Sequence, residues 1–414
     1  MKLKLHWQIF IAMILGFLFA TIFPDQADKA TPLGDIFMRL LRMVIVPLIF
    51  TSIVSGVAGI GDSRSLGRLG AKTFSYYMAS SFLAILVGLT LTNVIQPGVG
   101  VEVAQEVRIS PEDLDTPGSI ADILMRIIPV NPVRAAAEGD ILGLIFFAIV
   151  FGFAITQLPE KQRGGFLAFF DSGFEVMMKL TRAVIRLAPI GVFGLIARAV
   201  SLMGADLFQA VGKYMLTITL GLTIHFLIVL PALFFLLTRK SPLLHYRAMA
   251  SAMAMAFSAS SSSATLPLTL ESMRKNAGVS NKVSSFVLPM GATINMDGTA
   301  LYECAGVLFI AQALGIDLDF GAQVLVVITA LLASIGAAGI PSAGLVMIFI
   351  VLQAVNITTP AAYALVGLML AVDRPLDMYR TVVNITSDSI GAAIIAHSEG
   401  EDLAYPMAME QDNA

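Results

Sequence analysis

Apolar runs long enough to cross a lipid bilayer recur along almost the whole of this sequence, and they constrain its fold more than any other feature. A helix needs about 20 mainly apolar residues to span the hydrocarbon core. Six such runs precede residue 240, at 7–23, 36–60, 71–95, 119–157 (interrupted by prolines), 164–200 and 206–238. Only 13% of the residues are charged, against roughly a quarter in soluble domains. The sequence therefore predicts an all-α polytopic membrane protein.

The charged loops orient these predicted spans. Lysine and arginine gather on alternate connections, which the positive-inside rule places in the cytoplasm. The loop 97–118 carries five acidic residues and one arginine, which suits the outer side. We expect a multi-pass protein of the cell (inner or plasma) membrane with both termini cytoplasmic. The first apolar run is expected to be a span, because no small-residue cleavage site of a signal peptide follows it.

Beyond residue 240 two apolar segments are interrupted by small polar residues. SSSATLP lies at 261–267 and SIGAAGIPSAG at 334–344, and each predicted tip ends near a proline, Pro267 or Pro341. The arms, of about a dozen residues, are too short to cross roughly 30 Å, so we interpret both segments as re-entrant helical hairpins. A span with polar residues follows each one. The predicted fold has eight transmembrane helices plus two re-entrant hairpins in inverted repeats, which place a transporter's site near the midplane.

The last predicted span carries one polar stripe. Asp373, Asp377, Arg380, Asn384 and Asp388 are spaced by 4, 3, 4 and 4 residues, so they fall within about 80° of one another around a helix. Because charges in lipid are costly, the stripe needs a common reason. A structural ion-pair network is one reading; the mixed signs favour a site for a small zwitterion and cations.

The types of these residues predict an acidic amino acid as the substrate. Arg380 can bind a carboxylate through two parallel hydrogen bonds, and Asp377 suits an ammonium group. The serine tip at 261–263 can offer free backbone N–H groups to a second carboxylate.

The motif NMDGT at 295–299 indicates a cation site. Its glycine is expected to break the span and to free backbone carbonyls. Carbonyls and the carboxylates of Asp297 and Asp388 are hard oxygen ligands, which suit an alkali cation of sodium's size. A kinked structural helix is the alternative reading of this motif.

These motifs together resemble the dicarboxylate/amino acid:cation symporters, the glutamate transporter family. The resemblance rests on SSSATLP, NMDGT, SIGAAGIPSAG, YYxxSS at 76–81 and DxxxDxxRTxxNxxxD at 373–388, and it covers nearly the whole chain. It implies a sodium-coupled symporter of L-aspartate or L-glutamate, not an enzyme. The fold so implied is a homotrimer embedded in the lipid bilayer that works by an elevator mechanism.

The resemblance also implies the ligands at each position. The substrate would be bound by Arg380, Asp377, Thr381, Asn384, Ser261, Ser262, Ser263, Thr299 and Gly344. Several co-transported Na+ ions would be bound by Asp297, Asn295, Asp388, Asn384, Tyr77, Ser80, Ser81, Thr293, Met296, Ser334, Ile335 and Ala337.

The implied domains follow the spans. They are a scaffold part at 1–70 (spans one and two), a transport part at 71–96 (span three), an extracellular acidic loop at 97–118, a scaffold and trimerisation part at 119–205 (spans four and five), a transport part at 206–398 (span six, the hairpins, and spans seven and eight) and a cytoplasmic tail at 399–414. The acidic tail is expected to be solvated.

Several other functions are weighed against this reading. A proton-coupled glutamate/aspartate or C4-dicarboxylate symporter and a neutral amino acid transporter are the rivals within transport. Asp377 would repel a dicarboxylate that lacks an ammonium, and Arg380 would be left unmatched by a neutral amino acid. No GxGD, GxSG or GxxxxGK[ST] motif supports an intramembrane protease or an ATPase. A net charge of −3 offers no surface for nucleic acid, whereas a channel stays open as an alternative.

Overall fold

The protein is a bundle of helices. The computed structural model describes residues 5–59, 64–100, 128–138, 141–203, 207–336 and 343–405, and none of these forms a β-strand. The α-helices are α1 (Leu5–Ile22), α2 (Thr31–Ala58), α3 (Arg64–Ile95), α5 (Pro132–Glu138), α6 (Ile141–Thr156), α7 (Glu160–Ile185), α8 (Ala188–Met203), α9 (Leu207–Ile224), α10 (Leu230–Thr238), α11 (Pro242–Ala259), α12 (Ser262–Lys275), α13 (Asn281–Ile294), α14 (Asp297–Ala313), α15 (Phe320–Gly336), α16 (Ala343–Ala354) and α17 (Pro360–Ser398). A 3-10 helix, η1 (Pro24–Ala30), precedes α2, and a π-helix, η4 (His225–Val229), joins α9 to α10.

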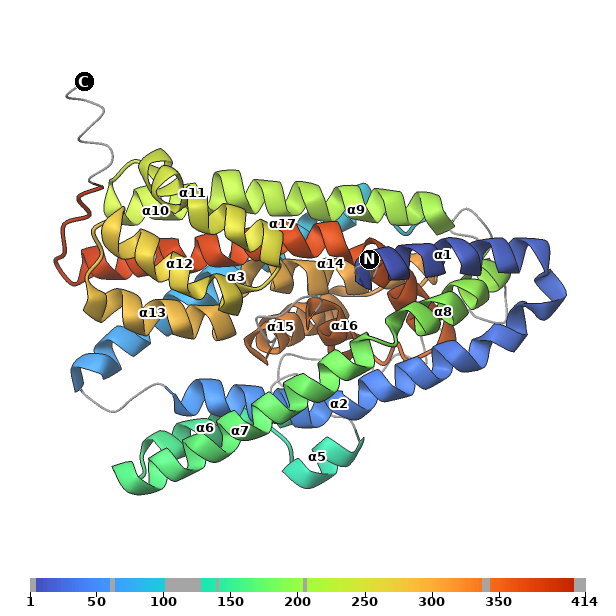
Figure 1. Ribbon diagram of the computed structural model, residues 1–414, viewed down its shortest axis with the longest axis horizontal. Helices are drawn as coiled ribbons and strands as arrows, with labels where there is room; N and C mark the ends of the chain where they lie inside the picture. Colours follow the sequence, from blue (N-terminus) through green and yellow to red (C-terminus); the bar gives the residue numbers. More distant parts are fainter. Residues whose placement is uncertain are drawn as a thin grey trace.

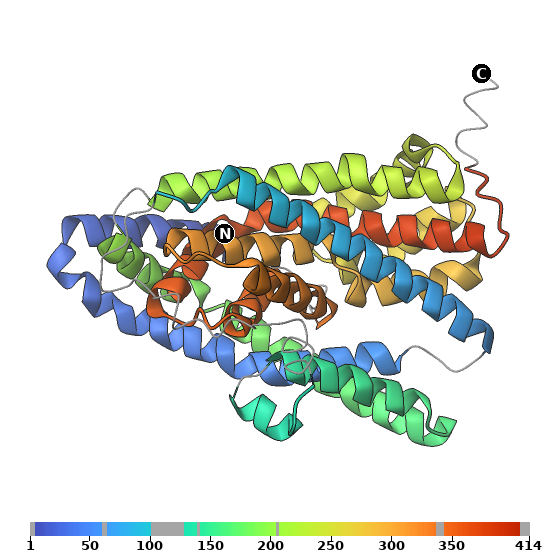
Figure 2. The same ribbon diagram turned by 180° about the vertical axis from the view of Figure 1, so that it is seen from behind.

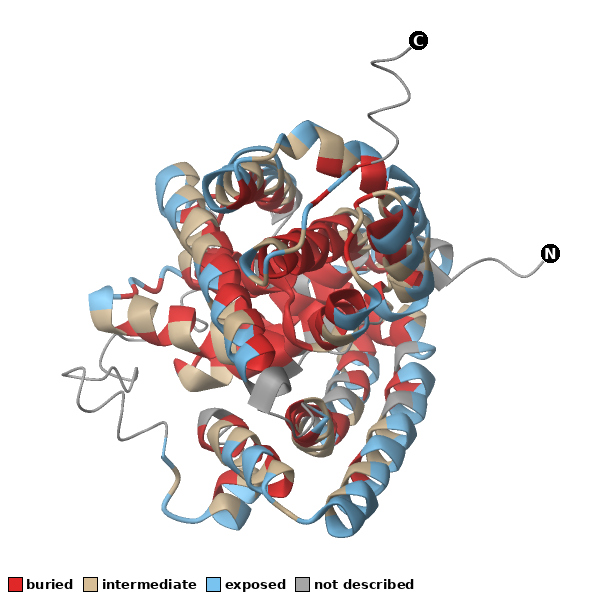
Figure 3. Cartoon of the chain, turned by 90° about the vertical axis from the view of Figure 1, so that its left-hand side faces the viewer, coloured by how far each residue is buried: buried red, intermediate tan, exposed pale blue. Residues whose placement is uncertain are grey.

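The long helices run roughly along the longest axis of the molecule (Figure 1). α1, α2, α6, α7 and α8 pack among themselves, whereas α3 packs along α14 and α9, and α17 packs against α11, α13 and α14. α17 also contacts α8 and thereby joins the two groups. Seen from behind, α3 runs obliquely across the helices that pack around α14 and α17 (Figure 2). The end-on view places the buried residues at the centre of the bundle (Figure 3).

Among the described residues, two helical stretches are individually long and apolar enough to cross a membrane. They are Arg68–Ile95 and Gln209–Thr238. A third span results if Glu160–Val184 and Ala188–Arg198, which meet at 57°, are taken together. The predicted single run at 164–200 is therefore wrong in detail, because the chain leaves the helix at Arg186 and Leu187 and continues in a new direction.

The outward faces of many helices are apolar. α6 reads ILGLIFFAIVFGFAIT and carries no polar side face. Phe153, Phe169 and Leu216 are each more than 60% exposed. Such surfaces suit a hydrocarbon solvent, in which exposed apolar side chains need no cover.

The first predicted hairpin corresponds to α11 and α12, which pack against each other. Ser260 ends α11 in the left-handed conformation (φ 49°), and Ser261 caps α12 by accepting a hydrogen bond from the Ala264 N–H at 3.2 Å. Pro267 does not mark the end of the tip as expected, because it lies inside α12. The second pair, α15 and α16, is also in contact, but Pro341 and Ala337 lie outside the described residues.

The predicted break within NMDGT is present, but the glycine does not make it. α13 ends at Ile294 and α14 begins at Asp297, so the residues with non-helical backbone are Asn295 and Met296. Gly298 lies inside α14. A Cβ there would come within 2.9 Å of the Arg380 side chain and backbone, so this glycine allows α14 to approach α17 closely.

The start of the tail is packed and not solvated as predicted. Glu399 accepts hydrogen bonds from Arg68 and Lys72 of α3, both at 2.6 Å. Glu401 accepts from the N–H and hydroxyl of Ser280, which caps α13. Leu403 and Tyr405 are buried. We call residues 399–405 the C-terminal strap, because they tie helices that are far apart in sequence; residues 406–414 lie outside the described residues.

Candidate functional site

A buried guanidinium lies at the centre of the polar stripe on α17. Arg380 is 1% exposed, and its Nη2 donates to Asp377 Oδ1 at 2.6 Å and lies 3.5 Å from Asp373 Oδ1. Its Cζ lies 4.2 Å from the centre of the Tyr302 ring, a cation–π contact. The structure thus pairs Arg380 with Asp377, the residue predicted to meet the substrate's ammonium.

The other arm of this guanidinium is available for a ligand. No described residue makes a hydrogen bond to Arg380 Nη1. A Cβ added to Gly344, at the start of α16, would lie 3.1 Å from Nη1 and 3.0 Å from Thr299 Cγ2. The backbone of α16 therefore covers the guanidinium with no side chain between them. The predicted substrate residues Arg380, Asp377, Thr299 and Gly344 meet at this point.

Asn384 joins α17 to α14 one turn beyond Arg380. Its Oδ1 accepts from the Gly298 N–H at 2.8 Å, and its Nδ2 donates to Thr299 Oγ1 at 3.2 Å. Thr381 is buried between Asp377 and Asn384, and its hydroxyl donates to the Asp377 carbonyl at 2.8 Å. Asn384 therefore lies on the same side of α17 as Arg380, whereas Thr381 lies about 100° around the helix from it.

A second cluster surrounds Asp297, the first residue of α14. Its Oδ1 accepts from the hydroxyls of Ser80 at 3.1 Å and Ser81 at 2.7 Å, which α3 brings together as predicted. Its Oδ2 lies 2.9 Å from His225 Nε2. With Asp297 ionised, Nε2 is the donor in this contact. The carboxylate is fully buried among hydroxyl and imidazole groups.

Asn295 links this cluster to Asp388. Its Nδ2 donates to Asp388 Oδ1 at 2.9 Å, and Ser80 Oγ donates to Asn295 Oδ1 at 3.3 Å. Tyr77, whose hydroxyl donates to the Val287 carbonyl at 2.7 Å, lies against Gly291 together with Asp388. The predicted sodium ligands Ser80, Ser81, Asn295, Asp297 and Asp388 therefore form one connected group of oxygen-bearing side chains.

For the remaining predicted ligands the structure gives positions on helices but no shared contact. Ser261, Ser262 and Ser263 lie at the N-terminal end of α12, where the first N–H groups have no intrahelical partner. Of the other predicted sodium ligands, Thr293 and Met296 lie at the end of α13, and Ser334 and Ile335 lie on α15, which contacts α13. Their ligand roles stay predictions.

Two buried polar residues were missed by the sequence reasoning. His225, to which the sequence analysis gave no role, contacts Asp297 directly. Glu303 on α14 is fully buried, and no described residue hydrogen-bonds to either of its carboxylate oxygens. The available signal was a single ionisable residue inside an otherwise apolar run, which in a membrane segment is by itself a functional-site hypothesis.

Comparison with known proteins gives the family. The profile described as the sodium:dicarboxylate symporter family matches residues 5–398. The chain belongs to this family. It is 34% identical to the "Proton/glutamate-aspartate symporter" of Escherichia coli (strain K12), covering 99% of this chain and 97% of that protein. It is 33% identical to the "Proton/sodium-glutamate symport protein" of Geobacillus stearothermophilus (97% and 96%) and 36% identical to "Excitatory amino acid transporter 3" of Mus musculus (97% and 87%).

The interior of this symporter-family chain holds more acidic than basic side chains among the described residues. Five acidic side chains are at most 3% exposed: Asp297, Glu303, Asp373, Asp377 and Asp388. Among the described residues, Arg380 is the one buried arginine or lysine. Isolated buried carboxylates are strongly unfavourable unless a cation or a proton neutralises them. The site geometry therefore favours the entry of positive charge.

Proposed function

We propose that this protein is a sodium-coupled secondary active symporter of acidic amino acids, L-aspartate or L-glutamate. One observation carries the proposal: a buried Arg380 guanidinium whose Nη1 has no hydrogen-bond partner among the described residues, in an interior that otherwise holds several carboxyl groups. The arginine gives a binding point for an anionic side chain, and the surplus carboxylates require accompanying cations. The names of the relatives agree, since they are glutamate and aspartate symporters.

On binding, the substrate replaces the ion pair between Arg380 and Asp377 with its own contacts to both side chains. A substrate carboxylate accepts hydrogen bonds from Arg380 Nη1 and Nη2 and takes the place that Asp377 holds at 2.6 Å. Asp377, released from the guanidinium, then receives the substrate's ammonium. A dicarboxylate without an ammonium would leave Asp377 unpaired, and a neutral amino acid would leave Arg380 with Asp377 alone.

Sodium enters as co-transported cargo at the oxygen-rich group. Asp297 and Asp388 supply negative charge, and the hydroxyls of Ser80 and Ser81 and the Asn295 amide supply neutral oxygens. Carboxylate, hydroxyl and carbonyl oxygens are the ligands that hard cations prefer. Asn384 lies between this group and Arg380, so the cation and substrate sites share one stretch of α17.

The transport cycle is proposed to be an elevator movement within a homotrimer. α3, α9 and α11–α17 would form the moving domain, and α1, α2 and α5–α8 the scaffold, because each group packs mainly within itself. In this proposal α11–α12 and α15–α16 are re-entrant hairpins of inverted repeats among eight transmembrane helices. The domains keep the predicted limits 1–70, 71–96, 119–205 and 206–398. Both termini would be cytoplasmic.

Proton coupling is the second candidate. Glu303 favours it, because a buried carboxyl without a hydrogen-bond partner is more stable neutral than charged. One relative is named as a proton symporter and another as a proton/sodium symport protein. The two modes differ in which cation gradient drives uptake.

Calorimetric binding to the purified protein tests the substrate class. L-Aspartate, L-glutamate, succinate and L-alanine are titrated in sodium buffer and in choline buffer. We expect binding of L-aspartate or L-glutamate in sodium only, with succinate and L-alanine at least tenfold weaker. Succinate binding as tightly as L-aspartate would contradict the role of Asp377, and tight L-alanine binding would contradict that of Arg380.

A further inference from the structure

A buried histidine lies near the middle of the apolar stretch Gln209–Thr238, which is long enough to cross a membrane. The side chain of this residue, His225, is fully buried. An ionisable side chain within such a stretch is costly and is by itself a reason to look for a function. His225 is not among the predicted ligands, yet its Nε2 lies 2.9 Å from Oδ2 of Asp297, which is one of them.

The backbone at His225 departs from the α-helix. His225 is the first residue of η4, and the Leu230 N–H donates to the His225 carbonyl five residues earlier. Pro231 has no N–H, so it cannot donate to the Phe226 carbonyl as a continuing π-turn would require. The Tyr246 hydroxyl of α11 donates to that carbonyl instead. Single π-turns of this kind are frequent at functional sites.

Residues on both sides of His225 are held by other helices. Thr223 Oγ1 lies 3.0 Å from the Tyr379 hydroxyl of α17. The Phe226 ring packs edge-on against Tyr246 of α11 and against Tyr379, with ring centres 4.9 and 6.2 Å apart. Packing against α11 and α17 therefore sets the position from which the imidazole reaches Asp297.

The two carboxylate oxygens of Asp297 face different helices. Oδ1 accepts from the hydroxyls of Ser80 and Ser81 of α3, whereas Oδ2 lies against His225. Ser80 also donates to Asn295 Oδ1, so this further predicted sodium ligand is connected through the Oδ1 side. Oδ1 is therefore the oxygen that a cation would share with the hydroxyl groups, and the imidazole holds the other one.

The imidazole supplies a hydrogen bond without cancelling the charge of Asp297. No described residue hydrogen-bonds to His225 Nδ1. A second proton on Nδ1 would be buried without an acceptor, so the neutral ring with its proton on Nε2 fits this site. Outer hydrogen bonds of this kind orient metal ligands, and losing one typically weakens metal binding about 10- to 100-fold.

We propose that His225 is a positioning residue for sodium. Its Nε2–H holds Asp297 Oδ2, so that Oδ1 faces the hydroxyls of Ser80 and Ser81 with its charge available to the ion. This inference rests on the proposed function, because it requires Asp297 to be a sodium ligand. His225 contacts Asp297 and acts on the ion only through the direction of this carboxylate.

Calorimetric titration of sodium into the purified full chain, in choline buffer without substrate, tests the proposal. His225→Leu removes the donor at a similar side-chain volume and should raise the sodium concentration for half-saturation at least tenfold. His225→Gln keeps an N–H donor and should recover most of the parent affinity. At saturating sodium both variants should bind L-aspartate about as tightly as the parent chain, because the contacts of Arg380 and Asp377 are unchanged.

His245→Leu is the matched control for destabilisation. His245 is also fully buried, and its ring nitrogens lie 3.0 Å from the Tyr405 hydroxyl and 2.9 Å from Ser389 Oγ. The variant should lower the melting temperature, as His225→Leu does, but leave the sodium titration unchanged. An equal loss of sodium affinity in the two variants would trace the effect to destabilisation and would overturn the proposal.

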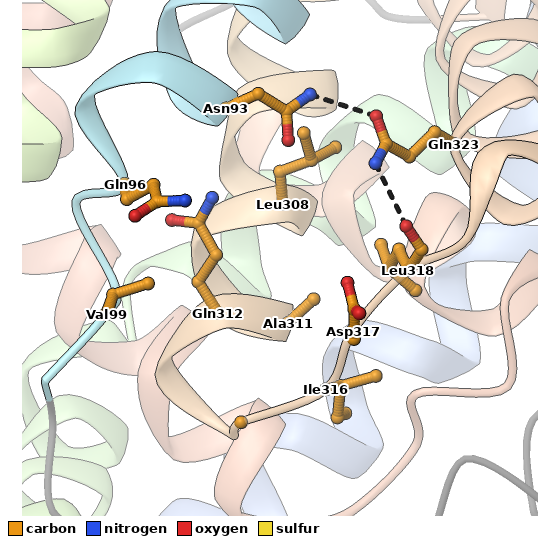
Figure 4. A pocket seen from close by; sticks show the side chains of 11 residues that line it. Asn93, Gln96, Val99, Leu308, Ala311, Gln312, Ile316, Asp317, Leu318 and Gln323 are labelled. Carbon is orange, nitrogen blue, oxygen red and sulfur yellow. Dashed lines mark hydrogen bonds between the residues drawn. The ribbon is translucent and has the colours of Figure 1, made fainter.

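Asp317→Asn tests whether the measured heat comes from the buried group. Asp317 lines an open depression at the end of α3, together with amide side chains that include Asn93 and Gln323 (Figure 4). Carboxylate and amide oxygens also suit a cation there. The sodium titration of Asp317→Asn should match that of the parent chain, and sodium binding that this variant removes would overturn the proposal.

The remaining outcomes separate this inference from the proposed function. If the parent chain needs sodium to bind L-aspartate but His225→Leu has the parent's sodium affinity, the inference alone is overturned. A His225→Gln variant as weak as His225→Leu would overturn it too, because the hydrogen bond would then not be what matters. A parent chain that binds L-aspartate equally well without sodium would overturn sodium coupling and the inference together.

Discussion

At the scale of single residues, Arg380 is expected to set the substrate class. Its rigid fork binds a carboxylate in a way that the point charge of lysine does not reproduce. Charge-assisted hydrogen bonds contribute about 1.5–3 kcal/mol each. Arg380→Lys should therefore weaken L-aspartate binding at least tenfold in calorimetry. Arg374→Lys is the matched control, because Arg374 is partly exposed and lies 3.9 Å from Asp377; an equal loss in both variants would contradict the assignment.

Asp297 is expected to act on sodium more than on substrate. Asp297→Asn keeps the size of the side chain but removes one of the buried negative charges beside Ser80 and Ser81. The sodium concentration for half-maximal uptake should rise by about tenfold or more, as for the loss of a metal-orienting group. Asp319→Asn provides the same change at an exposed helix cap. An unchanged sodium dependence in Asp297→Asn would place the cation elsewhere.

The residue patterns predicted the site unevenly. Asp373, Asp377, Arg380, Asn384 and Asp388 could be placed on one face of a helix by spacing alone, and α17 confirms that they share one helix. Their partners could not be predicted, because the contact of Arg380 with Tyr302, or of Asp297 with His225, depends on how α14, α9 and α17 pack. Sequence spacing describes one helix and carries no information on its neighbours.

At the scale of helices, α16 makes its closest approach to the site through Gly344. A Cβ at this position would lie 3.0–3.2 Å from Thr299 and Arg380. Gly344→Ala should weaken L-aspartate binding several-fold by pushing α16 away from the guanidinium. Gly212→Ala on α9, where a Cβ meets nothing within 4 Å, should leave binding unchanged. Equal behaviour of the two variants would remove α16 from the account.

The C-terminal strap predicts a pH-dependent stability. Hydrogen bonds from Lys72 and Arg68 lower the pKa of Glu399 from its ordinary value. A lowered carboxyl pKa stabilises the folded chain above the unfolded-state pKa of about 4.3, and this contribution is lost as the pH falls through the folded pKa. Glu399→Gln should lower the melting temperature by a few degrees at pH 7 and flatten its acid dependence.

The control for the strap is Glu138→Gln, which removes a carboxylate from an exposed pair within α5. This change should leave the melting temperature almost unchanged, because exposed pairs contribute little. If Glu399→Gln also leaves both the melting temperature and its pH dependence unchanged, the strap does not hold α3 to α17. The acidic composition of the tail predicted that it is solvated. This prediction failed for residues 399–405 because Leu403 and Tyr405 are buried against the packed helices, a surface that composition does not reveal.

At the scale of the whole molecule, the helical membrane class follows from composition, whereas the bend between α7 and α8 does not. Apolar length predicted one run at 164–200, and the chain nevertheless turns at Arg186 and Leu187. The break at Asn295 and Met296 was expected from NMDGT, although Gly298 does not make it. Such breaks are tolerated because neighbouring helices satisfy the freed backbone groups. The interior of the bundle holds Arg380 and several buried carboxyl groups, whose neutralisation requires cations or protons.

Uptake of L-aspartate into proteoliposomes tests this central claim most directly. An inward sodium gradient, an inward proton gradient and no gradient are compared, with Arg380→Ala in parallel. The account predicts accumulation driven by sodium and lost in Arg380→Ala. Accumulation driven by protons alone, with no effect of sodium, would contradict sodium coupling and shift the role of charge neutralisation to a proton on a buried carboxyl such as Glu303.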